Sequence, residues 1–302
     1  MIDPIILTDP ARANYPIPLL VRYPIGATGP RPVVIWNHGG HPSPNGRQRS
    51  AEWGNTLAVA GYVVVHPSRV LLQNVAPLLA ECQANGFSTP AMCAYWISQS
   101  RYGAQTTHFL IANFAQIMAA SPALTGMLDA QQIVVAGHSA GSSVVLANAG
   151  AWQRWTPGGQ TYNERNPQAV AFLASGVQGP MYAGFSSGFQ PASFADIDRP
   201  FMSITGAGDE TGEPSAARTT AWLTSRAGNK ALLWDVVPEA VHETMDIDKC
   251  DTPVRADHCR WIASAGLAYL DSVVRRRPEA KRWMVSPALA ALTGGAIELH
   301  RR

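Results

Sequence analysis

Short runs of β-branched and other apolar residues alternate along the chain with longer, alanine-rich amphipathic segments. Several apolar runs are nearly uninterrupted, which is typical of strands buried on both faces. Strands that alternate with helices in this way pair in parallel and carry helices on both sides of the sheet. The pattern predicts an α/β fold with a mostly parallel central sheet. We expect strands at residues 19–23, 32–37, 62–66, 132–137, 169–174, 201–205 and 231–237, and helices at 50–60, 105–119, 140–152, 214–227 and 260–274.

Two irregular segments interrupt this alternation, at residues 74–100 and 177–198. No internal repeat and no linker-like run divides the chain, so we predict one domain over residues 1–302. Long irregular insertions in a compact domain tend to be functional loops. We therefore expect the second segment, which is rich in Gly, Ser and Phe, to form a lid or a pocket wall.

Composition agrees with a folded globule and narrows the range of partners. The 302 residues are 46% hydrophobic and 15% charged, with a formal net charge of +2. A charge this balanced, without a long Lys/Arg run, provides no surface that would follow a phosphate backbone, so nucleic acid is not an expected partner. No apolar run approaches the roughly 18 to 20 residues that span a bilayer, so we expect no transmembrane segment.

Four cysteines form two sequence-local pairs, Cys82 with Cys93 and Cys250 with Cys259. Neither pair has the C-x-x-C spacing of a metal or redox motif. Local disulfides are the simplest interpretation, because such short loops can close where the chain turns back. The alternative is four buried free thiols. Disulfides would favour a periplasmic or secreted location, and free thiols a cytoplasmic one.

The pentapeptide Gly137-His138-Ser139-Ala140-Gly141 follows an apolar run and opens an alanine-rich helical stretch. This is the G-x-S-x-G pattern between a strand and a helix, where the serine serves as a nucleophile. Such a serine has a strained backbone, so the residues two before and two after it must be small, as both glycines are. We predict Ser139 as the nucleophile. We expect the Ala140 N–H, at the helix start, to be one oxyanion donor.

A second oxyanion donor is expected in the loop after an earlier strand. Asn37-His38-Gly39-Gly40 ends the apolar run at residues 33–36, and we predict the Gly40 N–H as this donor. The alternative is an ordinary glycine-rich turn after a strand.

The remaining catalytic groups are expected at the ends of two later strands. Asp209 follows the strand predicted at residues 201–205, and His242 follows the next strand. In this order His242 accepts the proton of Ser139, and Asp209 orients and stabilises the imidazole. Glu210 and Glu213 are rival acids, but they lie further into the loop.

Taken together, these segments resemble the α/β-hydrolase superfamily. The resemblance is to the branch with dienelactone-hydrolase-like proteins, platelet-activating-factor-acetylhydrolase-like esterases and bacterial polyester hydrolases, and it covers nearly all of the chain. It implies a single-domain α/β-hydrolase fold and carboxylic-ester hydrolysis through an acyl-enzyme, without a cofactor. The segments that carry it are Leu7-Thr8-Asp9-x-x-Arg12, Arg22-Tyr23-Pro24, 32–40, 60–64, 137–141, 205–209 and His242.

Two features depart from the pattern of this branch. Dienelactone hydrolases proper usually carry a cysteine nucleophile, so Ser139 favours an esterase over that ring-opening reaction. Related branches often place an acidic residue in the helix before the nucleophile strand, where this chain has His108. The second departure concerns the subfamily rather than the triad.

Side chains close to these motifs are candidates for binding the substrate. His41 directly follows Gly40, and His66 ends the strand after the oxyanion loop. Aromatic residues and methionines gather in the irregular region after the elbow and suggest an apolar cleft that accepts aromatic groups. From this region we assign Met181, Tyr182, Phe185 and Phe189 to substrate binding.

The spacing Asp246-x-Asp248-x-x-Asp251 resembles part of a calcium loop. It lacks the glycine and the distal glutamate of the full loop, so we expect a polar turn and no metal.

The sequence therefore predicts a serine carboxylic-ester hydrolase for small to medium esters, including aromatic or polymeric ones. One alternative is hydrolysis of a thioester or activated amide, because the same oxyanion hole serves any acyl transfer. Another is a catalytically inactive α/β-hydrolase that serves as a binding module. The intact Ser139, Asp209 and His242 argue against this last alternative.

Overall fold

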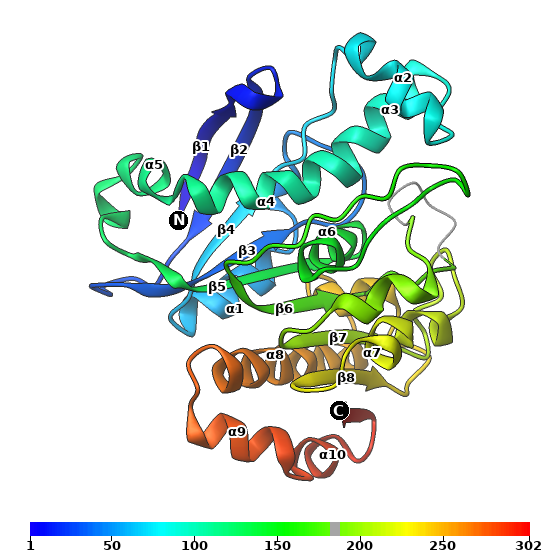
Figure 1. Cartoon of the computed structure of the whole chain (residues 1–302). Helices are drawn as coiled ribbons and strands as arrows, with labels where there is room; N and C mark the ends of the chain where they lie inside the picture. The colour runs from blue at the N-terminus through cyan, green and yellow to red at the C-terminus, as the bar shows by residue number, and fades with distance from the viewer. Residues whose placement is uncertain (182–187) are drawn as a thin grey trace.

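Nine strands form one sheet in the computed structural model, which describes residues 1–181 and 188–302 (Figure 1). Neighbouring strands from β4 to β8 are parallel, and the β1/β2, β2/β4 and β8/β9 pairs are antiparallel. The mostly parallel sheet expected from the sequence is confirmed. In sheet order the strands are β1 (Ile2–Asp9), β2 (Tyr15–Arg22), β4 (Val63–Pro67), β3 (Arg31–Asn37), β5 (Leu128–His138), β6 (Ala169–Ser175), β7 (Phe201–Gly206), β8 (Lys230–Asp235) and β9 (Ile297–Arg301).

Helices cover both faces of the sheet, as the alternation of strands and helices predicts. Helices α1 (Ala51–Val59) and α8 (Pro253–Val273) contribute to the apolar core on one face. The opposite face packs against α4 (Tyr102–Ala112), α5 (Phe114–Ala119), α6 (Ala140–Ala149) and α7 (Thr220–Thr224). The other helices are α2 (Leu79–Ala84), α3 (Pro90–Trp96), α9 (Pro278–Val285) and α10 (Ala288–Thr293).

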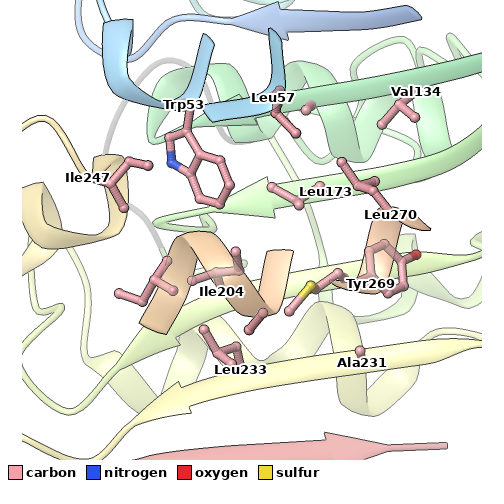
Figure 2. Close-up of a cluster of buried hydrophobic side chains, with 14 of the residues drawn as sticks. Trp53, Leu57, Val134, Leu173, Ile204, Ala231, Leu233, Ile247, Tyr269 and Leu270 are labelled. Carbon is pink, nitrogen blue, oxygen red and sulfur yellow. The ribbon is translucent and has the colours of Figure 1, made fainter. Parts of the chain in front are cut away.

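Alternate residues of each central strand enter different cores because strand side chains point to opposite faces. In β3, Val34 and Trp36 join the core under α1 and α8, whereas Val33 and Ile35 join the core under α4 and α5. Trp36 stacks on Trp53 of α1 with ring centroids 5.0 Å apart. Figure 2 shows Trp53 in this first core, among side chains from the sheet and α8.

The two edge strands, β1 and β9, were not expected from the apolar runs. Each pairs antiparallel with one neighbour at the margin of the sheet. In β9 only Ile297 is buried, and three of the other four residues are exposed. An edge strand buried on one side carries too few apolar residues to give the signal of a buried strand.

Four of the predicted helices have different limits or character, one of them because α8 begins at Pro253, seven residues before the predicted start. The helix predicted at 105–119 is two helices, because Asn113 breaks the regular pattern between α4 and α5. The helix predicted at 140–152 ends at Ala149, where Gly150 adopts a positive φ of 117°, a common way to end a helix. The helix predicted at 214–227 is a 3₁₀ turn, Ser215–Thr219, followed by the short α7.

The segment at residues 74–100 is helical, so its interpretation as an irregular insertion is wrong. It forms α2 and α3, followed by one turn of π-helix, Ile97–Arg101. The Cys82–Cys93 disulfide joins α2 to α3, and Phe87 stacks on Trp96 at 4.7 Å. Covalent and aromatic contacts thus support helices too short to show a helical period in the sequence.

The predicted local cysteine pairing is confirmed, with disulfides Cys82–Cys93 and Cys250–Cys259. In the other segment singled out from the sequence, 177–198, a 3₁₀ helix spans Pro191–Asp196, and residues 182–187 lie outside the described residues. No helix of the described chain combines the length and the apolar character needed to cross a membrane.

Candidate active site

The residues singled out as catalytic candidates follow the carboxyl ends of four parallel strands. The loop at Gly39 and Gly40 follows β3, and Ser139 follows β5. Asp209 follows β7, and His242 follows β8. Since parallel strands end at the same edge of a sheet, loops from distant parts of the sequence meet there.

Ser139 occupies the sharp turn between β5 and α6. Its backbone has φ 54° and ψ −121°, a conformation that non-glycine residues rarely adopt, and its N–H donates to the carbonyl of Ser175 at 2.9 Å. Backbone strain of this kind costs roughly 1–3 kcal/mol and is found mainly where function requires it. The turn leaves the side chain of Ser139 half-buried at a pocket.

The neighbouring strand β3 lies so close to this turn that only small residues fit beside it, in agreement with the glycines expected there. A Cβ atom on Gly137 would lie 2.6 Å from the carbonyl oxygen of Asn37, at the end of β3. A Cβ atom on Gly141 would lie 2.6 Å from the carbonyl carbon of the same residue. The two glycines therefore allow β3 and the elbow to approach each other closely.

Two backbone segments border Ser139 and are candidates for the oxyanion hole. Gly39 and Gly40 line the same pocket as Ser139, and a Cβ atom on Gly39 would lie 3.2 Å from the Cβ of Ser139. Ala140 is the first residue of α6, whose N-terminal N–H groups carry partial positive charge. The loop after β3 thus lies against the serine, as the sequence predicts for an oxyanion loop.

His242 and Asp209 form a direct, buried contact. Nδ1 of His242 donates to Oδ1 of Asp209 at 2.6 Å, which leaves Nε2 as the acceptor of the neutral ring. Nε2 is buried and has no hydrogen-bond partner among the described residues. His242 lines the same pocket as Ser139. The arrangement places a ring nitrogen without a hydrogen-bond partner among the described residues in the pocket that Ser139 also lines.

Arg218 is part of the site and was missed in the sequence. It is fully buried, and its Nε donates to the backbone carbonyl of Asp209 at 2.8 Å and lies 3.2 Å from the Asp209 carboxylate. Thr205 donates to the second carboxylate oxygen at 3.0 Å. Burial alone would raise the pKa of Asp209, but the hydrogen bond from His242, the charges of His242 and Arg218 and the hydrogen bond from Thr205 together lower it. Nothing in its sequence position distinguishes Arg218 from a solvent-facing arginine on a helix.

Glu213, one of the two rival acids, contacts a different segment from the candidate triad. Its Oε1 accepts the N–H of Gly179 at 2.6 Å and lies 3.8 Å from Nη1 of Arg218. Burial raises the pKa of Glu213 despite these contacts. Of the two carboxylates near Arg218, Asp209 is the one bonded to His242.

His138, next to the serine in sequence, packs against His242. It is buried, its Nε2 lies 3.0 Å from the carbonyl of His242, and the two rings are 4.7 Å apart. Its Nδ1 is 3.7 Å from a carboxylate oxygen of Asp246. Burial, reinforced by the charge of His242, lowers the pKa of His138 to about 3. Burial raises the pKa of Asp246 to about 8, so near neutral pH both groups are mostly uncharged.

The pocket at the serine has a volume of about 430 Å³, and most of its lining residues have polar or charged side chains. Positive and negative side chains both reach it. The lining residues are Gly39, Gly40, Arg49, His138, Ser139, His242, Glu243, Asp246, Asp248 and Lys249.

The sequence-based substrate candidates are dispersed. His41 is exposed, and its ring lies 2.8 Å from the hydroxyl of Tyr95. Met181 is 65% exposed. His66 is fully buried against Gly54 and Arg22, so its assignment to the cleft is wrong, because the end of β4 is covered by α1.

Phe189 is likewise wrong as a pocket residue, because it is buried against Phe194 in the core under α6. Other aromatics of this region, Trp155 and Tyr162, pack on Trp96 near the Cys82–Cys93 disulfide. Apolar residues that follow one another in sequence are thus divided between two separate clusters. Tyr182 and Phe185, the remaining substrate candidates, lie outside the described residues.

The three aspartates that resemble part of a calcium loop have separate partners. Asp246 accepts from the hydroxyl of Ser50, Asp248 accepts the N–H groups of residues 51 and 52 at the start of α1, and Asp251 pairs with Arg255. Among the described residues, no group of three or more His, Cys, Asp or Glu side chains could hold a metal ion.

Comparisons with known proteins support the fold. Neither a family model nor a curated protein matches the chain. A solved structure from Klebsiella pneumoniae subsp. pneumoniae MGH 78578, described as "Putative Dienelactone Hydrolase", is similar with a TM-score of 0.51 and 17% identity, over 88% of this chain and 97% of that one. At this identity the likeness concerns the fold alone. The chain therefore has the α/β-hydrolase fold that the sequence predicts.

Proposed function

We propose that this protein is a serine carboxylic-ester hydrolase with the triad Ser139, His242 and Asp209. The observation that carries the proposal is the Asp209–His242 contact of 2.6 Å, together with the His242 ring, which lines one pocket with Ser139 and whose Nε2 has no partner among the described residues. A base oriented by a buried carboxylate beside a serine on a strained turn is the arrangement that serine acyl transfer requires.

In the proposed reaction, Oγ of Ser139 attacks the carbonyl carbon of the ester, and its proton moves to Nε2 of His242. The carbonyl oxygen becomes an oxyanion, which the N–H groups of Ala140 and the Gly39–Gly40 loop stabilise. The carbon–oxygen bond to the alcohol breaks, and the alkoxide leaves with the proton from His242. Water then attacks the acyl-enzyme by the same route and releases the carboxylic acid.

Asp209 holds the ring of His242 in the tautomer with hydrogen on Nδ1, and it stabilises the imidazolium formed in each step. The ionised state of Asp209 is supported by Arg218 and Thr205, which lower its pKa together with His242. No step in this scheme requires a cofactor.

The pocket volume of about 430 Å³ favours small to medium esters. Arg49 and Lys249 provide positive charge at the pocket, and Glu243 and Asp248 provide negative charge.

Replacement of the nucleophile tests this proposal. We expect Ser139→Ala to lose nearly all turnover of a p-nitrophenyl acyl ester and all labelling by an organophosphonate, with an unchanged melting profile. Ser286→Ala, the same change at the exposed serine that directly follows α9, is the control. Unchanged hydrolysis by Ser139→Ala would refute the assignment. Turnover of the oxygen ester, the thioester and the activated amide of one acyl group would show which of these acyl-transfer reactions the protein favours.

A further inference from the structure

Arg69 lies behind the oxyanion loop and is 3% exposed. It follows β4 by two residues, and its Nη2 donates to the carbonyl of His38 at 2.5 Å and to that of Gly40 at 3.3 Å. In a trans peptide the C=O and N–H bonds point in opposite directions. Because Arg69 holds the carbonyl of residue 38, the N–H of Gly39 in the same peptide points away from Arg69.

Arg49 applies the same constraint to the next peptide. Its Nη1 donates to the carbonyl of Gly39 at 2.7 Å, which directs the N–H of Gly40 away from Arg49. Arg49 lines the pocket, whereas Arg69 lies beneath the loop. Two arginines thus fix the orientation of both peptides that could donate to an oxyanion.

The charge of Arg69 is not neutralised locally. No carboxylate of the described residues lies within ion-pair distance of its guanidinium, and Nη1 has no hydrogen-bond partner among them. Burial lowers the pKa of Arg69 to about 10, which leaves the group protonated at neutral pH. An unpaired buried charge is costly, so its retention calls for a compensating role.

Gln99 connects Arg69 to the other side of the oxyanion hole. Its Oε1 accepts from Nε of Arg69 at 3.3 Å, and its Nε2 donates to the carbonyl of Ala140 at 3.4 Å. Gln99 is buried and lies in the π-helical turn Ile97–Arg101, a form of helix that occurs frequently at functional sites. One buried pair therefore links the loop after β3 to the start of α6.

We infer that Arg69 and Gln99 form a positioning unit that aligns the two halves of the oxyanion hole, and that the unneutralised charge of Arg69 stabilises the negative oxygen formed there. The inference rests on the proposed function. Neither residue touches the substrate, and both act through the backbone of Gly39, Gly40 and Ala140. In a medium of low polarity a charge behind the loop acts over a longer distance than it would in water.

Variants at Gln99 separate alignment from charge. Gln99→Met removes both hydrogen bonds of the linking amide and leaves Arg69 charged. Gln99→Glu also removes the donor to the carbonyl of Ala140, but it places a negatively charged carboxylate next to the guanidinium of Arg69. Arg69→Lys keeps the charge and loses the forked donor. Arg275→Lys, which changes a part-buried arginine bonded to the carbonyl of Ala60 away from the pocket, is the matched control.

The readout is the inhibition constant of a trifluoromethyl ketone, which forms a tetrahedral oxyanion on the serine, beside that of the carboxylic acid product. Loss of one oxyanion donor costs about 10²–10³-fold in kcat, so we expect partial misalignment in Gln99→Met to cost roughly 10-fold and Gln99→Glu roughly 100-fold. The ketone should weaken by the same factors. KM and product inhibition should stay within about twofold, and the control should match wild type.

Equal weakening of ketone and product would overturn the inference, because it would indicate general disturbance of the pocket. Equal kcat for Gln99→Met and Gln99→Glu would overturn the role of the charge. If Arg69→Lys does not fold, the Gln99 pair still decides the question. Wild-type protein that neither hydrolyses esters nor reacts with a phosphonate would instead refute the proposed function.

Discussion

Two buried histidine–aspartate pairs lie near the carboxyl ends of β7 and β8, and only one is proposed to be catalytic. His242 contacts Asp209 through Nδ1 at 2.6 Å, and His258 on α8 contacts Asp235 through Nδ1 at 2.5 Å. Both aspartates are fully buried. By the contact alone, the two pairs could not be told apart.

Their electrostatic surroundings differ. Burial raises the pKa of Asp235, and its hydrogen bonds with the N–H of Val237 and with His258 do not offset this effect. The pKa of Asp209 is lowered in spite of burial, by His242, Arg218 and Thr205. The two contacts are similar, yet the pKa of Asp235 is raised and that of Asp209 is lowered. The buried Arg218 beside Asp209 contributes to this difference.

The two histidine rings also differ in what they contact besides the aspartate. His242 lines the pocket that contains Ser139, whereas His258 packs edge-on against Trp261 at 4.9 Å. A histidine–carboxylate contact therefore identifies a catalytic base only together with a nucleophile and a pocket.

The largest expected difference between the two pairs appears when each imidazole is removed in turn. We expect His242→Ala to lower kcat by about 10⁴-fold, because the proton of Ser139 then lacks an acceptor. His258→Ala should retain most of kcat and lower the melting temperature instead, since it leaves Asp235 buried without its partner. Steady-state kinetics and thermal melting of both variants check this. A similar loss of kcat in both would contradict the distinction between the pairs.

A second variant is expected to move the pKa of Asp209 upward, the direction found for Asp235. Arg218→Met removes the buried cation, so the pKa of Asp209 should rise, and the acid form should appear at higher pH. Because the ionised form is needed, the acidic limb of the kcat profile should move to higher pH, with a loss of roughly 10- to 100-fold near neutrality. Arg218→Lys, which retains the charge, should recover part of the activity. An unshifted acidic limb in Arg218→Met would exclude this role.

A third change separates the elements that carry the two histidines. The Cys250–Cys259 disulfide joins the chain after His242 to α8 beside His258. Closing so short a loop contributes about 2–3 kcal/mol, so the double Cys→Ser variant should lose stability by that amount. Chemical unfolding measures the loss, with the corresponding change at Cys82 and Cys93 for comparison. Four reactive thiols in untreated wild-type protein would contradict both disulfides.

The smallest effect concerns a longer histidine–aspartate contact, in which Nδ1 of His138 lies 3.7 Å from the carboxyl group of Asp246. The folded-state pKa of Asp246 is about 8 and its ordinary value 3.8, so the folded protein holds a proton that the unfolded chain releases between these pH values. Stability from this group is present below about pH 4 and is lost as the pH rises to about 8. Asp246→Asn does not ionise, so its melting temperature should exceed that of wild type by about 2–4 °C at pH 8.5 and by less at pH 5. A difference that does not grow with pH would contradict a protonated Asp246.

The apolar runs were sufficient to predict the central strands and the order of the loops, and hence where Ser139, Asp209 and His242 would lie. Strands buried on both faces and a strand–serine–helix turn are local in sequence. The supporting side chains were not predictable, because Arg69, Gln99 and Arg218 act through contacts between distant elements. The assignment of Phe189 to the pocket was wrong for the same reason, since hydrophobicity shows that Phe189 is apolar but not which cluster buries it.

The C-terminal strand β9 has a consequence for self-association. An edge strand exposes unpaired backbone groups that can template pairing with another chain. Beyond β8, this edge presents Glu298, His300 and Arg301, all exposed. Joining two such edges would bring the charged side chains of Glu298 and Arg301 against a second chain, so we expect the edge to resist strand-to-strand aggregation.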